Sequence, residues 1–373
     1  MSLLTRGGRA SDLIVRYEDE LKLFRTWQQK LGYFLLFVVW LITPLMISDK
    51  WLNILTYCGM FAIGAIGLNI LTGFTGQVSL GHAFFIGCGA YTVAYFGVKH
   101  ELTMTTWLPL AAIVGAVVGA IVGPFALRLR GQYLAIITLG LLFIGEHIFD
   151  NWRSVTGGGF GTSTAVPLDL GPIDFTKLSV FGTDYTRWQG MFWFYWALVA
   201  LGALLAKNLL RSRPGRALQA VRDRDLAAEV IGVSQFRYKV GAFALSSAYA
   251  AVAGALYGAF IQYVDPEQFG GVRGLFLSIQ FIAMIILGGV GTVFGGVLGA
   301  LVIGSIPFLI KDYATSIPLV TWEIGNKPIL DVPLLEQVLY GLLIIAFLLL
   351  EPRGLAAVWL RLKAYFKTWP FSY

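Results

Sequence analysis

Long apolar runs separated by short polar segments dominate the chain. Most of the runs contain about 17–23 residues, the length of helix that crosses a hydrocarbon core of about 30 Å. Helices and closed barrels satisfy their backbone polar groups in lipid, and runs of this length favour helices. The pattern predicts an all-α, polytopic transmembrane helical bundle of about ten spans. The predicted spans are Leu31–Ile47, Leu52–Leu71, Leu80–Val98, Trp107–Leu127, Tyr133–Phe149, Gly190–Leu210, Val240–Gln262, Leu275–Leu287, Val293–Ile310 and Leu334–Leu350.

The basic residues between the spans predict which ends face the cytoplasm. If the N-terminus is cytoplasmic and the sides alternate, the inner segments hold most of these residues and the outer segments hold few. This distribution satisfies the positive-inside rule, so both the N- and C-termini are predicted to be cytoplasmic. Leu275–Leu287 is short, and a re-entrant half-helix is its alternative interpretation. The inner basic residues are Arg128, Arg130, Arg211, Arg213, Arg216, Arg222, Arg224, Arg353, Arg361, Lys363 and Lys367.

The polar segments divide the chain into regions. Residues 1–30 form a polar cytoplasmic leader with apolar residues at helical spacing, including Leu13, Tyr17 and Leu21. This spacing favours an amphipathic helix on the membrane surface, with a partly disordered leader as the alternative. Residues 31–354 form the membrane domain, with an external loop at 150–189 and a cytoplasmic loop at 211–239. Residues 355–373 form a cytoplasmic tail.

Composition agrees with a protein that lies mostly in lipid. Hydrophobic residues make up 57% of the chain and charged residues 13%, whereas soluble domains have about 25% charged residues. The net charge of +7 comes from basic residues at span ends, where they set topology and meet anionic lipid, so nucleic acid is not an expected partner. Cys58 and Cys88 lie in apolar runs and are predicted to be free buried thiols, without metal-site spacing.

Two glycine-rich segments come into register when the chain is shifted by 215 positions. An internal repeat explains the match, and chance in a chain with 44 glycines is the alternative. Matching glycine breaks in two repeats are a usual pointer to a translocation pathway at their interface. Parallel and inverted halves both remain open, because the uncertain Leu275–Leu287 segment decides between them. The matched pairs are Gly73 with Gly288, Gly76 with Gly291, Gly81 with Gly296 and Gly89 with Gly304.

The first glycine-rich segment, residues 71–82, also carries neutral polar side chains near membrane depth. Thr75, Gln77, Ser79 and His82 offer hydrogen-bonding groups that are costly in lipid unless they face protein or water. A pathway-lining hinge is one interpretation, and a tight packing corner with locally satisfied hydroxyls is the other. For His82, a packed histidine is at least as good an interpretation as a gate or proton carrier.

The chain offers no energy source of its own. The second glycine-rich segment, residues 288–296, lacks the Gly-Lys-Ser/Thr ending of a phosphate-binding loop, and the chain contains no Gly-Lys dipeptide. Ionisable residues are nearly absent from the span centres, whereas proton- or ion-driven carriers use such residues as a relay. No catalytic or metal-ligating constellation stands out. Active transport would therefore need energy from another subunit. The alternative is a stand-alone channel or secondary carrier for a small neutral solute such as urea.

The cytoplasmic loop has the features of a docking element. Residues 215–233 contain two short helical stretches rich in Ala, Leu and charge, with Asp225 as a candidate cap and Gly232 at the end. A short, partly apolar helix of this kind can dock in the groove of a motor protein. A basic loop that rests on anionic lipid is the alternative.

Four motifs in matching order give the chain a family resemblance. It resembles the permease subunits of branched-chain amino acid ABC importers, the LivM type, from about Trp51 to Gly354. Relatives in the family are associated with leucine, isoleucine and valine, and also with urea, short amides and aromatic acids. The motifs are Leu71–Phe85 (LTGFTGQVSLGHAFF), Arg130–Gly140 (RGQYLAIITLG), Thr156–Gly161 (TGGGFG) and Gly215–Gly232.

The resemblance implies partners, a location and site residues. The partners would be a second homologous permease, two cytoplasmic ATPases that bind ATP and Mg²⁺, and an extracytoplasmic solute-binding protein, in a bacterial inner membrane. This chain itself would hold no cofactor. Thr75, Gln77, Ser79, His82, Tyr133 and Thr138 become pathway candidates. Gly73, Gly76, Gly81, Gly288, Gly291 and Gly296 become hinge or packing candidates. Arg222, Asp223, Ala227, Ala228, Glu229 and Gly232 become candidates for ATPase coupling.

Overall fold

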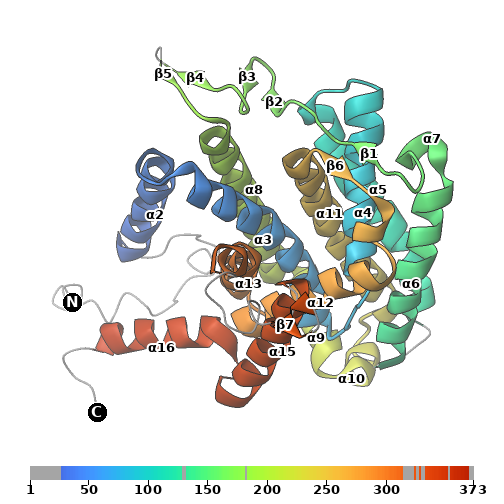
Figure 1. Cartoon of the computed structure of the whole chain (residues 1–373). Coiled ribbons are helices and arrows are strands. Elements are labelled where there is room, and N and C mark those ends of the chain that lie inside the picture. The colour runs from blue at the N-terminus through green and yellow to red at the C-terminus, as the bar shows by residue number, and fades with distance from the viewer. Residues whose placement is uncertain are drawn as a thin grey trace. The chain divides into compact units, whose positions relative to one another are not determined.

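The computed structural model describes residues 27–127, 132–180, 183–313, 323–324, 327–328, 332–351 and 353–368. Nearly all of its regular structure is helical (Figure 1). The helices are α2 (Trp27–Met46), α3 (Asp49–Thr75), α4 (His82–Thr92), the π-helix η2 (Val93–Lys99), α5 (Met104–Leu127), α6 (Gln132–Asn151), α7 (Arg153–Thr156), α8 (Arg187–Arg211), α9 (Arg213–Asp223), α10 (Asp225–Val230), α11 (Gln235–Ile261), the 3-10 helix η3 (Pro266–Gln268), α12 (Gly271–Gly288), α13 (Val293–Tyr313), α15 (Val332–Leu350) and α16 (Gly354–Thr368).

Four two-stranded antiparallel pairs complete the described structure. They are β1 (Thr162–Ser163) with β6 (Tyr263–Val264), β2 (Asp169–Leu170) with β3 (Ile173–Asp174), β4 (Ser179–Val180) with β5 (Thr183–Asp184), and β7 (Glu323–Ile324) with β8 (Lys327–Pro328). In the longest-range pair, Thr162 lies opposite Val264.

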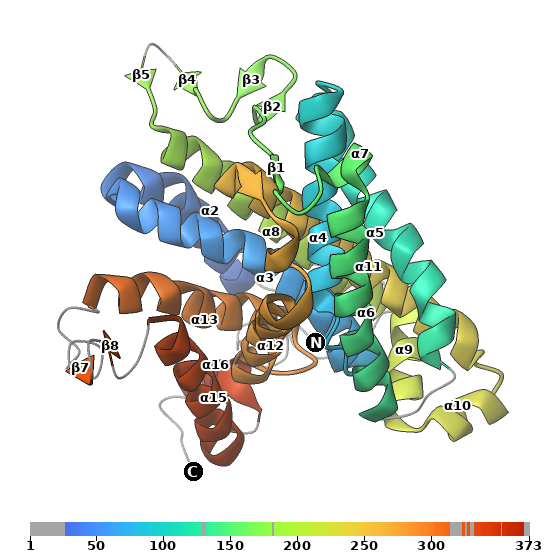
Figure 2. The ribbon, with the colours of Figure 1, turned by 45° about the vertical axis from the view of Figure 1, so that its right-hand side comes forward.

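The chain divides into two compact units at Ser48. Helix α2 is the described part of the first unit, and Asp49–Tyr373 forms the second. Within the second unit, α9 and α10 lie at one end and strands β1–β5 lie at the other, in both views (Figures 1 and 2). Every site discussed below belongs to the second unit.

Helix α3 forms the centre of the second unit. Twenty of its 27 residues are buried, as expected for a helix that is apolar on all sides. It packs against α8, α11, α12 and α13. A core cluster of side chains from α3, α4, α11 and α12, including Phe61, Phe85, Phe243 and Phe281, surrounds it.

Small residues allow α11 to cross α4 at backbone contact. A Cβ atom on Gly254 would lie 1.8 Å from the carbonyl oxygen of Ile86, and one on Gly89 would lie 1.8 Å from that of Ala251. Such close approach is how helices pack in lipid, where burial of apolar surface gives them no advantage. The contact fixes the position of α4, which begins at the first glycine-rich segment.

Nine of the ten predicted spans each overlap one described helix, but the helices differ in how well they suit a span. Seven are long and apolar enough to cross a membrane, or eight with the bent pair α15–α16, counted over the described residues. The predicted run Leu80–Val98 is divided into α4 and η2. The predicted run Leu275–Leu287 is part of α12, an 18-residue helix. The apolar run is shorter than the helix because Arg273 interrupts the apolar pattern. Arg273 instead forms an ion pair with Glu267 at 3.0 Å beside the helix start.

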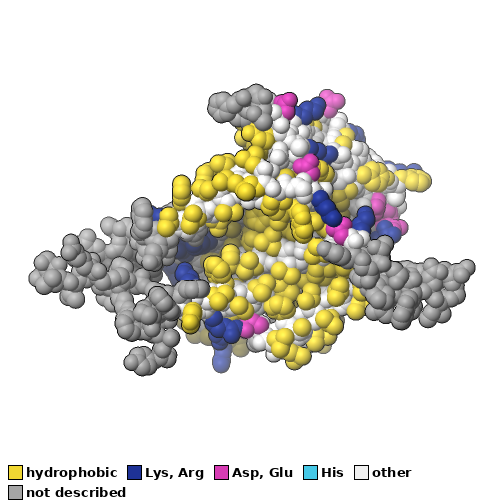
Figure 3. Space-filling view, turned by 60° about the vertical axis from the view of Figure 1, so that its left-hand side comes forward, with side chains coloured by type: hydrophobic (Ala, Val, Ile, Leu, Met, Phe, Trp, Pro, Cys, Tyr) yellow, Lys and Arg dark blue, Asp and Glu magenta, His cyan; other side chains and the backbone are white. Residues whose placement is uncertain are grey.

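The predicted leader, residues 1–30, overlaps the start of α2. Its residues 27–30 belong to that helix, and residues 1–26, which carry Leu13, Tyr17 and Leu21, lie outside the described residues, as do Arg128 and Arg130. On the face shown in Figure 3, hydrophobic side chains cover the middle and most charged side chains lie toward the edges. That distribution suits a protein embedded in lipid.

Candidate functional site

Both glycine-rich segments meet beside the end of α3, together with one arginine of the cytoplasmic-loop sequence. We call the contact of residues 69–76, 289–292 and Arg222 the glycine junction. The Arg222 guanidinium, at the end of α9, donates a 2.5 Å hydrogen bond to the carbonyl oxygen of Gly73. The Gly73 backbone packs so closely on the α12–α13 turn that a Cβ at Gly73 would lie 2.6 Å from the Gly291 nitrogen. A movement of α9 would therefore displace the end of α3 and the α12–α13 turn together.

A buried asparagine joins α3 to the α12–α13 turn. Asn69, which is fully buried, donates from Nδ2 to the carbonyl oxygen of Thr292 and accepts at Oδ1 from the backbone N–H of Gly291, both at 2.8 Å. These bonds satisfy polar groups that would be costly to leave unpaired inside a membrane protein. The turn is thus fixed to α3 by hydrogen bonds as well as by packing.

The two segments share a backbone feature at the positions that the 215-residue shift aligns. Gly76 and Gly291 both adopt left-handed backbone, with φ of +71° and +82°, a conformation that glycine adopts without steric cost. Phe61 of α3 stacks on Phe281 of α12, and near the end of α3 Gly73 meets Gly291 in the turn that follows α12. Because both contact positions increase together, α3 and α12 run in the same direction. The geometry therefore favours a parallel repeat over an inverted one.

Residues 76–81 are not helical and run back beside α3. His82, at the start of α4, bonds through Nε2 to the carbonyl oxygen of Gly64 at 3.0 Å. Gly64 lies about three helical turns, or roughly 16 Å, before the end of α3 at Thr75. Non-helical backbone at this depth is tolerated where it is buried in protein or lines a wet cavity. Here Leu80 donates its backbone N–H to Thr138 Oγ1 of α6 at 2.9 Å.

Five of the six pathway candidates are buried in this region, and one is not. Gln77 has 7% of its surface exposed and neither amide atom has a hydrogen-bond partner among the described residues. Thr138 is already engaged, since its hydroxyl donates to Ala135 and accepts from Leu80. Tyr133 is 67% exposed on α6 and does not join the group. The buried candidates are Thr75, Gln77, Ser79, His82 and Thr138.

The environment of His82 favours the packed interpretation. A carbonyl oxygen can only accept, so the bond to Gly64 makes Nε2 the protonated nitrogen. The ring also lies edge-on to Phe281, with centroids 5.0 Å apart. The backbone N–H of the next residue, Ala83, donates to Ser278 of α12 at 3.1 Å. His82 thus holds the start of α4 against α3 and α12.

The candidates for ATPase coupling differ in how exposed they are. Ala228 is buried, whereas Arg222, Asp223, Ala227 and Glu229 lie on the exposed side. Glu229 accepts a 2.9 Å hydrogen bond from Gln235 at the start of α11, which ties α10 to a core helix.

The ends of α10 correct one prediction. Asp225 is not the cap: the capping position is Arg224, and Asp225 is the first helical residue, with its carboxylate on the N–H of Leu226 at 2.9 Å. Gly232, with φ of +88°, follows the end of α10, and its N–H bonds to the carbonyl oxygen of Glu229. Gly232 therefore terminates the helix as predicted from the sequence.

Sequence reasoning missed the exposed apolar side chains of the same loop. Leu226, Val230 and Ile231 are 62%, 87% and 74% exposed, and Phe236 is 58% exposed. Leu226 and Val230 are four residues apart and therefore share a face of α10. The sequence contains this spacing, but the charged residues around it make the apolar face difficult to recognise. An exposed apolar patch at a loop tip marks an interaction surface.

Multiple apolar helices around a buried core helix, with paired glycine breaks inside, define a multi-pass membrane protein of the transporter class. Comparison with known proteins gives the family: a model described as branched-chain amino acid transport system / permease component matches residues 51–348. The chain belongs to this family.

Individual relatives agree with the family match. The high-affinity branched-chain amino acid permease proteins LivM of Salmonella typhimurium LT2 and Escherichia coli K12 are each 33% identical over 301 residues, covering 77% of this chain and 70% of the relative. LivH of Escherichia coli K12 is 27% identical over 280 residues, covering 71% of this chain and 86% of the relative. No solved structure matches the chain significantly.

Proposed function

We propose that this chain is the membrane-spanning permease subunit of an ATP-driven ABC importer for branched-chain amino acids or a related small polar solute. One observation carries the mechanism: the Arg222 guanidinium of the exposed α9–α10 loop bonds directly to Gly73, where both glycine breaks meet. A force on that loop is transmitted to α3 and to the α12–α13 turn without passing through a flexible linker.

The arrangement of the second unit supports a proposed topology. The α9–α10 end would face the cytoplasm and the β1–β5 end the exterior of a bacterial inner membrane, with ten spans and both termini inside. The opposite placement of these two ends supports this assignment (Figure 1), as does the positive-inside distribution. The leader (1–30), membrane domain (31–354) and tail (355–373), with loops 150–189 and 211–239, keep the bounds expected from the sequence.

The proposed motor contact is the exposed apolar face of α10. Leu226 and Val230 would enter a groove on one of two ATPase subunits, and ATP and Mg²⁺ would bind to those subunits. The hydrogen bond between Glu229 and Gln235 would transmit a movement of α10 to α11. The other proposed partners are a second, homologous permease and an extracytoplasmic solute-binding protein.

The proposed solute path passes the non-helical segment 76–81. Gln77 has the strongest claim to a solute contact, because both its amide atoms are buried without a partner among the described residues. The hydroxyls of Thr75 and Thr138 already donate to carbonyl oxygens, so they serve the packing of the segment. ATP-driven closure of the motor would displace α9, and Arg222 would shift the glycine junction that supports this segment.

Reconstitution tests the proposal. Vesicles containing the purified chain with its permease, ATPase and binding-protein partners should accumulate leucine only with ATP. Vesicles with this chain alone should show no leucine flux. ATP-independent flux through the chain alone would support a channel or secondary carrier and overturn the importer.

A double variant tests the proposed contact between α10 and the ATPase. Leu226→Asp combined with Val230→Asp should abolish co-purification of the ATPase, because carboxylates cannot enter an apolar groove. Leu170→Asp combined with Ile173→Asp is the matched control, since both side chains are exposed on the β2–β3 hairpin at the end opposite to α10 (Figure 2). Glu229→Arg should reduce uptake through loss of the Gln235 bond. Unchanged uptake in Glu229→Arg, or an ATPase that stays bound to the double variant, contradicts the coupling assignment.

A further inference from the structure

Helix α16 extends from the second unit at the end where α9 and α10 lie. In both views it is found on that side, away from strands β1–β5, and in Figure 1 it runs across the direction that joins the two ends (Figures 1 and 2). Its axis is bent by 43° from that of α15. Gly354 and Ala356 in its first turn are buried, whereas every residue from 358 to 365 is exposed. The bundle therefore covers the start of α16 and leaves residues 358–365 open.

The start of α16 is fixed on the α12–α13 turn. Gly354 adopts left-handed backbone, with φ of +69°, and a Cβ there would lie 2.5 Å from the Gly289 nitrogen. Farther along the helix, the Trp359 ring packs beside Phe294 of α13, with ring centroids 6.1 Å apart. Helix α16 thus begins at a turn that belongs to the glycine junction, and packing sets the direction in which it extends.

The exposed part of α16 has an apolar face. Leu362 lies four residues after Val358 and three after Trp359, so the three side chains share one side of the helix. Val358, Trp359 and Leu362 are 37%, 54% and 49% exposed. Leu360 is 59% exposed and lies two residues from both Val358 and Leu362, which places it on the opposite side. The two leucines are therefore equally apolar and similarly exposed but belong to different faces.

Basic residues flank the apolar face, and acidic residues are absent from this part of the sequence. Residues 354–373 contain Arg361, Lys363 and Lys367 but no Asp or Glu. Arg361 and Lys363 precede and follow Leu362, and each residue turns the helix by about 100°, so these two lie on either side of the face. Arg361 forms an ion pair with Glu351, whereas Lys363 is exposed and forms no ion pair among the described residues. Helix α16 thus carries positive charge along the margins of an apolar surface.

A lipid surface suits this helix better than a protein partner does. Leu342, Ile345 and Leu349 of the preceding helix α15 recur at helical spacing and are all exposed, as in a span that faces lipid. The cores of protein interfaces are depleted in lysine. Helices that lie in the membrane interface instead combine Lys and Arg with Trp and Leu on the apolar face. The long stems of Lys and Arg lie along apolar surface while their charges reach the headgroups.

We propose that α16 is an interfacial helix that binds anionic phospholipid headgroups. Val358, Trp359 and Leu362 enter the boundary between headgroups and acyl chains, and Arg361 and Lys363 contact headgroup phosphates on either side. Because α16 begins on the α12–α13 turn, this contact holds the glycine junction near the membrane surface. The lipid contact is independent of transport. Only its assignment to the cytoplasmic leaflet rests on the proposed function.

Fluorescence of the full-length chain in nanodiscs tests the proposal. Leu362→Cys and Leu360→Cys each carry an environment-sensitive dye, in a background where Cys58→Ala and Cys88→Ala remove the native thiols. Adding phosphatidylglycerol to phosphatidylcholine nanodiscs should shift the emission of the dye at 362 to the blue and bring it within reach of a lipid-bound quencher. The dye at 360 should stay open to aqueous iodide, and both results should persist after assembly with the partner subunits. Equal emission at both positions, a shift at 362 that needs no phosphatidylglycerol, or shielding of 362 from both quenchers in the complex would overturn the proposal.

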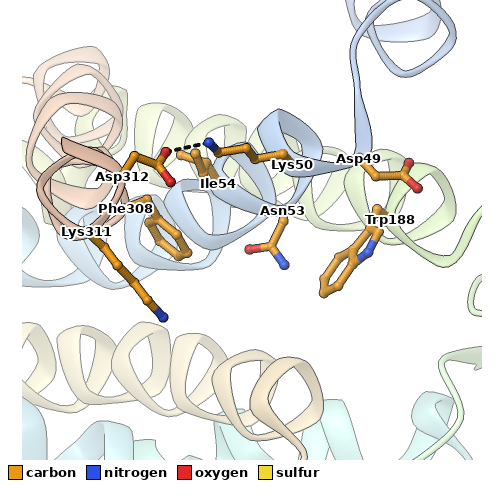
Figure 4. A pocket seen from close by; sticks show the side chains of 8 residues that line it. All are labelled: Asp49, Lys50, Asn53, Ile54, Trp188, Phe308, Lys311 and Asp312. Carbon is orange, nitrogen blue, oxygen red and sulfur yellow. Dashed lines mark ion pairs between the residues drawn. The ribbon is translucent and has the colours of Figure 1, made fainter. Parts of the chain in front are cut away.

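Charge variants identify the cause of the shift. Lys363→Gln combined with Lys367→Gln should lower the lipid-bound population of the helix about fivefold or more, since one lysine near an anionic surface contributes about that factor. Lys177→Gln combined with Lys311→Gln is the matched control and should leave the shift unchanged. Both of these lysines are exposed, and Lys311 lines a cavity between the first residues of α3 and the last residues of α13 (Figure 4). An equal loss in both double variants, or no loss in the first, would overturn the proposal. Because nanodiscs expose both leaflets, a topology opposite to the proposed one leaves these results unchanged and counts against the proposed function alone.

Discussion

Asn69 and Gly291 lie 222 positions apart in the sequence, yet the Asn69 amide oxygen accepts the backbone N–H of Gly291 at 2.8 Å while its amide nitrogen donates to the adjacent Thr292. One side chain therefore serves both hydrogen-bonding groups that the α12–α13 turn presents to α3. The contact joins the two members of the proposed repeat at their shared glycine break. Movement of either helix end must move the other or break this pair of bonds.

Asn69→Leu is expected to destabilise the complex. It leaves a buried N–H and a buried carbonyl without partners, at a cost of about 1–3 kcal/mol for each group. The thermal unfolding midpoint of the detergent-purified protein should fall by several degrees, as measured by tryptophan fluorescence. Equal midpoints for the wild type and Asn69→Leu would contradict the role of the bonds.

Gly291→Ala is expected to impair transport as well as stability. The left-handed backbone at φ +82° costs a residue with a Cβ about 1–2 kcal/mol, and the new Cβ would lie 2.9 Å from Nη1 of Arg222. Gly140→Ala is the matched control, because a Cβ there meets nothing within 4 Å. Leucine uptake per assembled complex should drop in Gly291→Ala and stay near wild type in Gly140→Ala. Similar uptake in both would show that the junction tolerates a side chain.

Arg222→Ala is expected to uncouple ATP hydrolysis from uptake. The variant removes the bond to Gly73 but none of the apolar residues on α10, so the ATPase should still co-purify. Hydrolysis should continue while ATP-driven uptake falls at least about tenfold, since a hydrogen bond from a charged donor contributes about 1.5–3 kcal/mol. Arg213→Ala, an exposed position at the start of the same helix, is the control and should retain uptake. A tightly coupled Arg222→Ala complex would remove the main support for the proposed mechanism.

His82 allows a test of packing against proton transfer. In Gln, the amide N–H can replace the Nε2–H donor that bonds to Gly64, so His82→Gln should keep most of the uptake. A proton carrier would instead lose activity and pH dependence together. Uptake by His82→Gln and wild type should therefore follow the same pH profile from mildly acidic to neutral conditions. A profile that flattens in the variant would favour the proton-carrier interpretation.

The sequence was sufficient for what depends on local pattern. Apolar run length located every described core helix, and the 215-position shift paired Gly76 with Gly291, which share a backbone conformation. Tertiary contacts were not accessible in this way. The hydroxyl of Thr138 and the amide of Gln77 are equivalent candidates in the sequence, but only Gln77 is without a partner among the described residues. Whether a polar side chain finds a hydrogen-bond partner depends on which helix packs opposite to it. The pattern of a single sequence does not show which helix that is.

Some of the contacts leave a local signal in the sequence. Asn69 is a polar side chain within an apolar span, a position that calls for a buried partner. Leu226 and Val230 have the spacing of one helical face. By contrast, nothing in the sequence pattern brings Lys311 to the beginning of α3, because that proximity arises from the packing of α13 on α3.

Phe160 offers a test of the external surface. Its side chain is 91% exposed, at the tip of a loop whose shape depends on Gly157, Gly158 and Gly161, all with positive φ. The Tyr263 hydroxyl donates to the Phe160 carbonyl oxygen. This bond fixes the backbone of the loop, while the Phe160 ring remains exposed. An exposed aromatic on a fixed loop is the kind of residue that dominates binding energy in interfaces.

Phe160→Ala should therefore weaken docking of the solute-binding protein by about tenfold or more, since hot-spot aromatics contribute at least about 2 kcal/mol. Biolayer interferometry with the binding protein immobilised and the nanodisc complex in solution would measure the Kd. Basal ATP hydrolysis should not change, because the connection from α7 to β1, which carries Phe160, lies at the end opposite to α9 and α10 (Figure 2). Trp152→Ala is the control: Trp152 is a 56% exposed aromatic just before α7, outside the glycine loop. Equal losses in both variants would indicate a general effect of removing aromatic surface, and no loss in Phe160→Ala would place the docking site elsewhere.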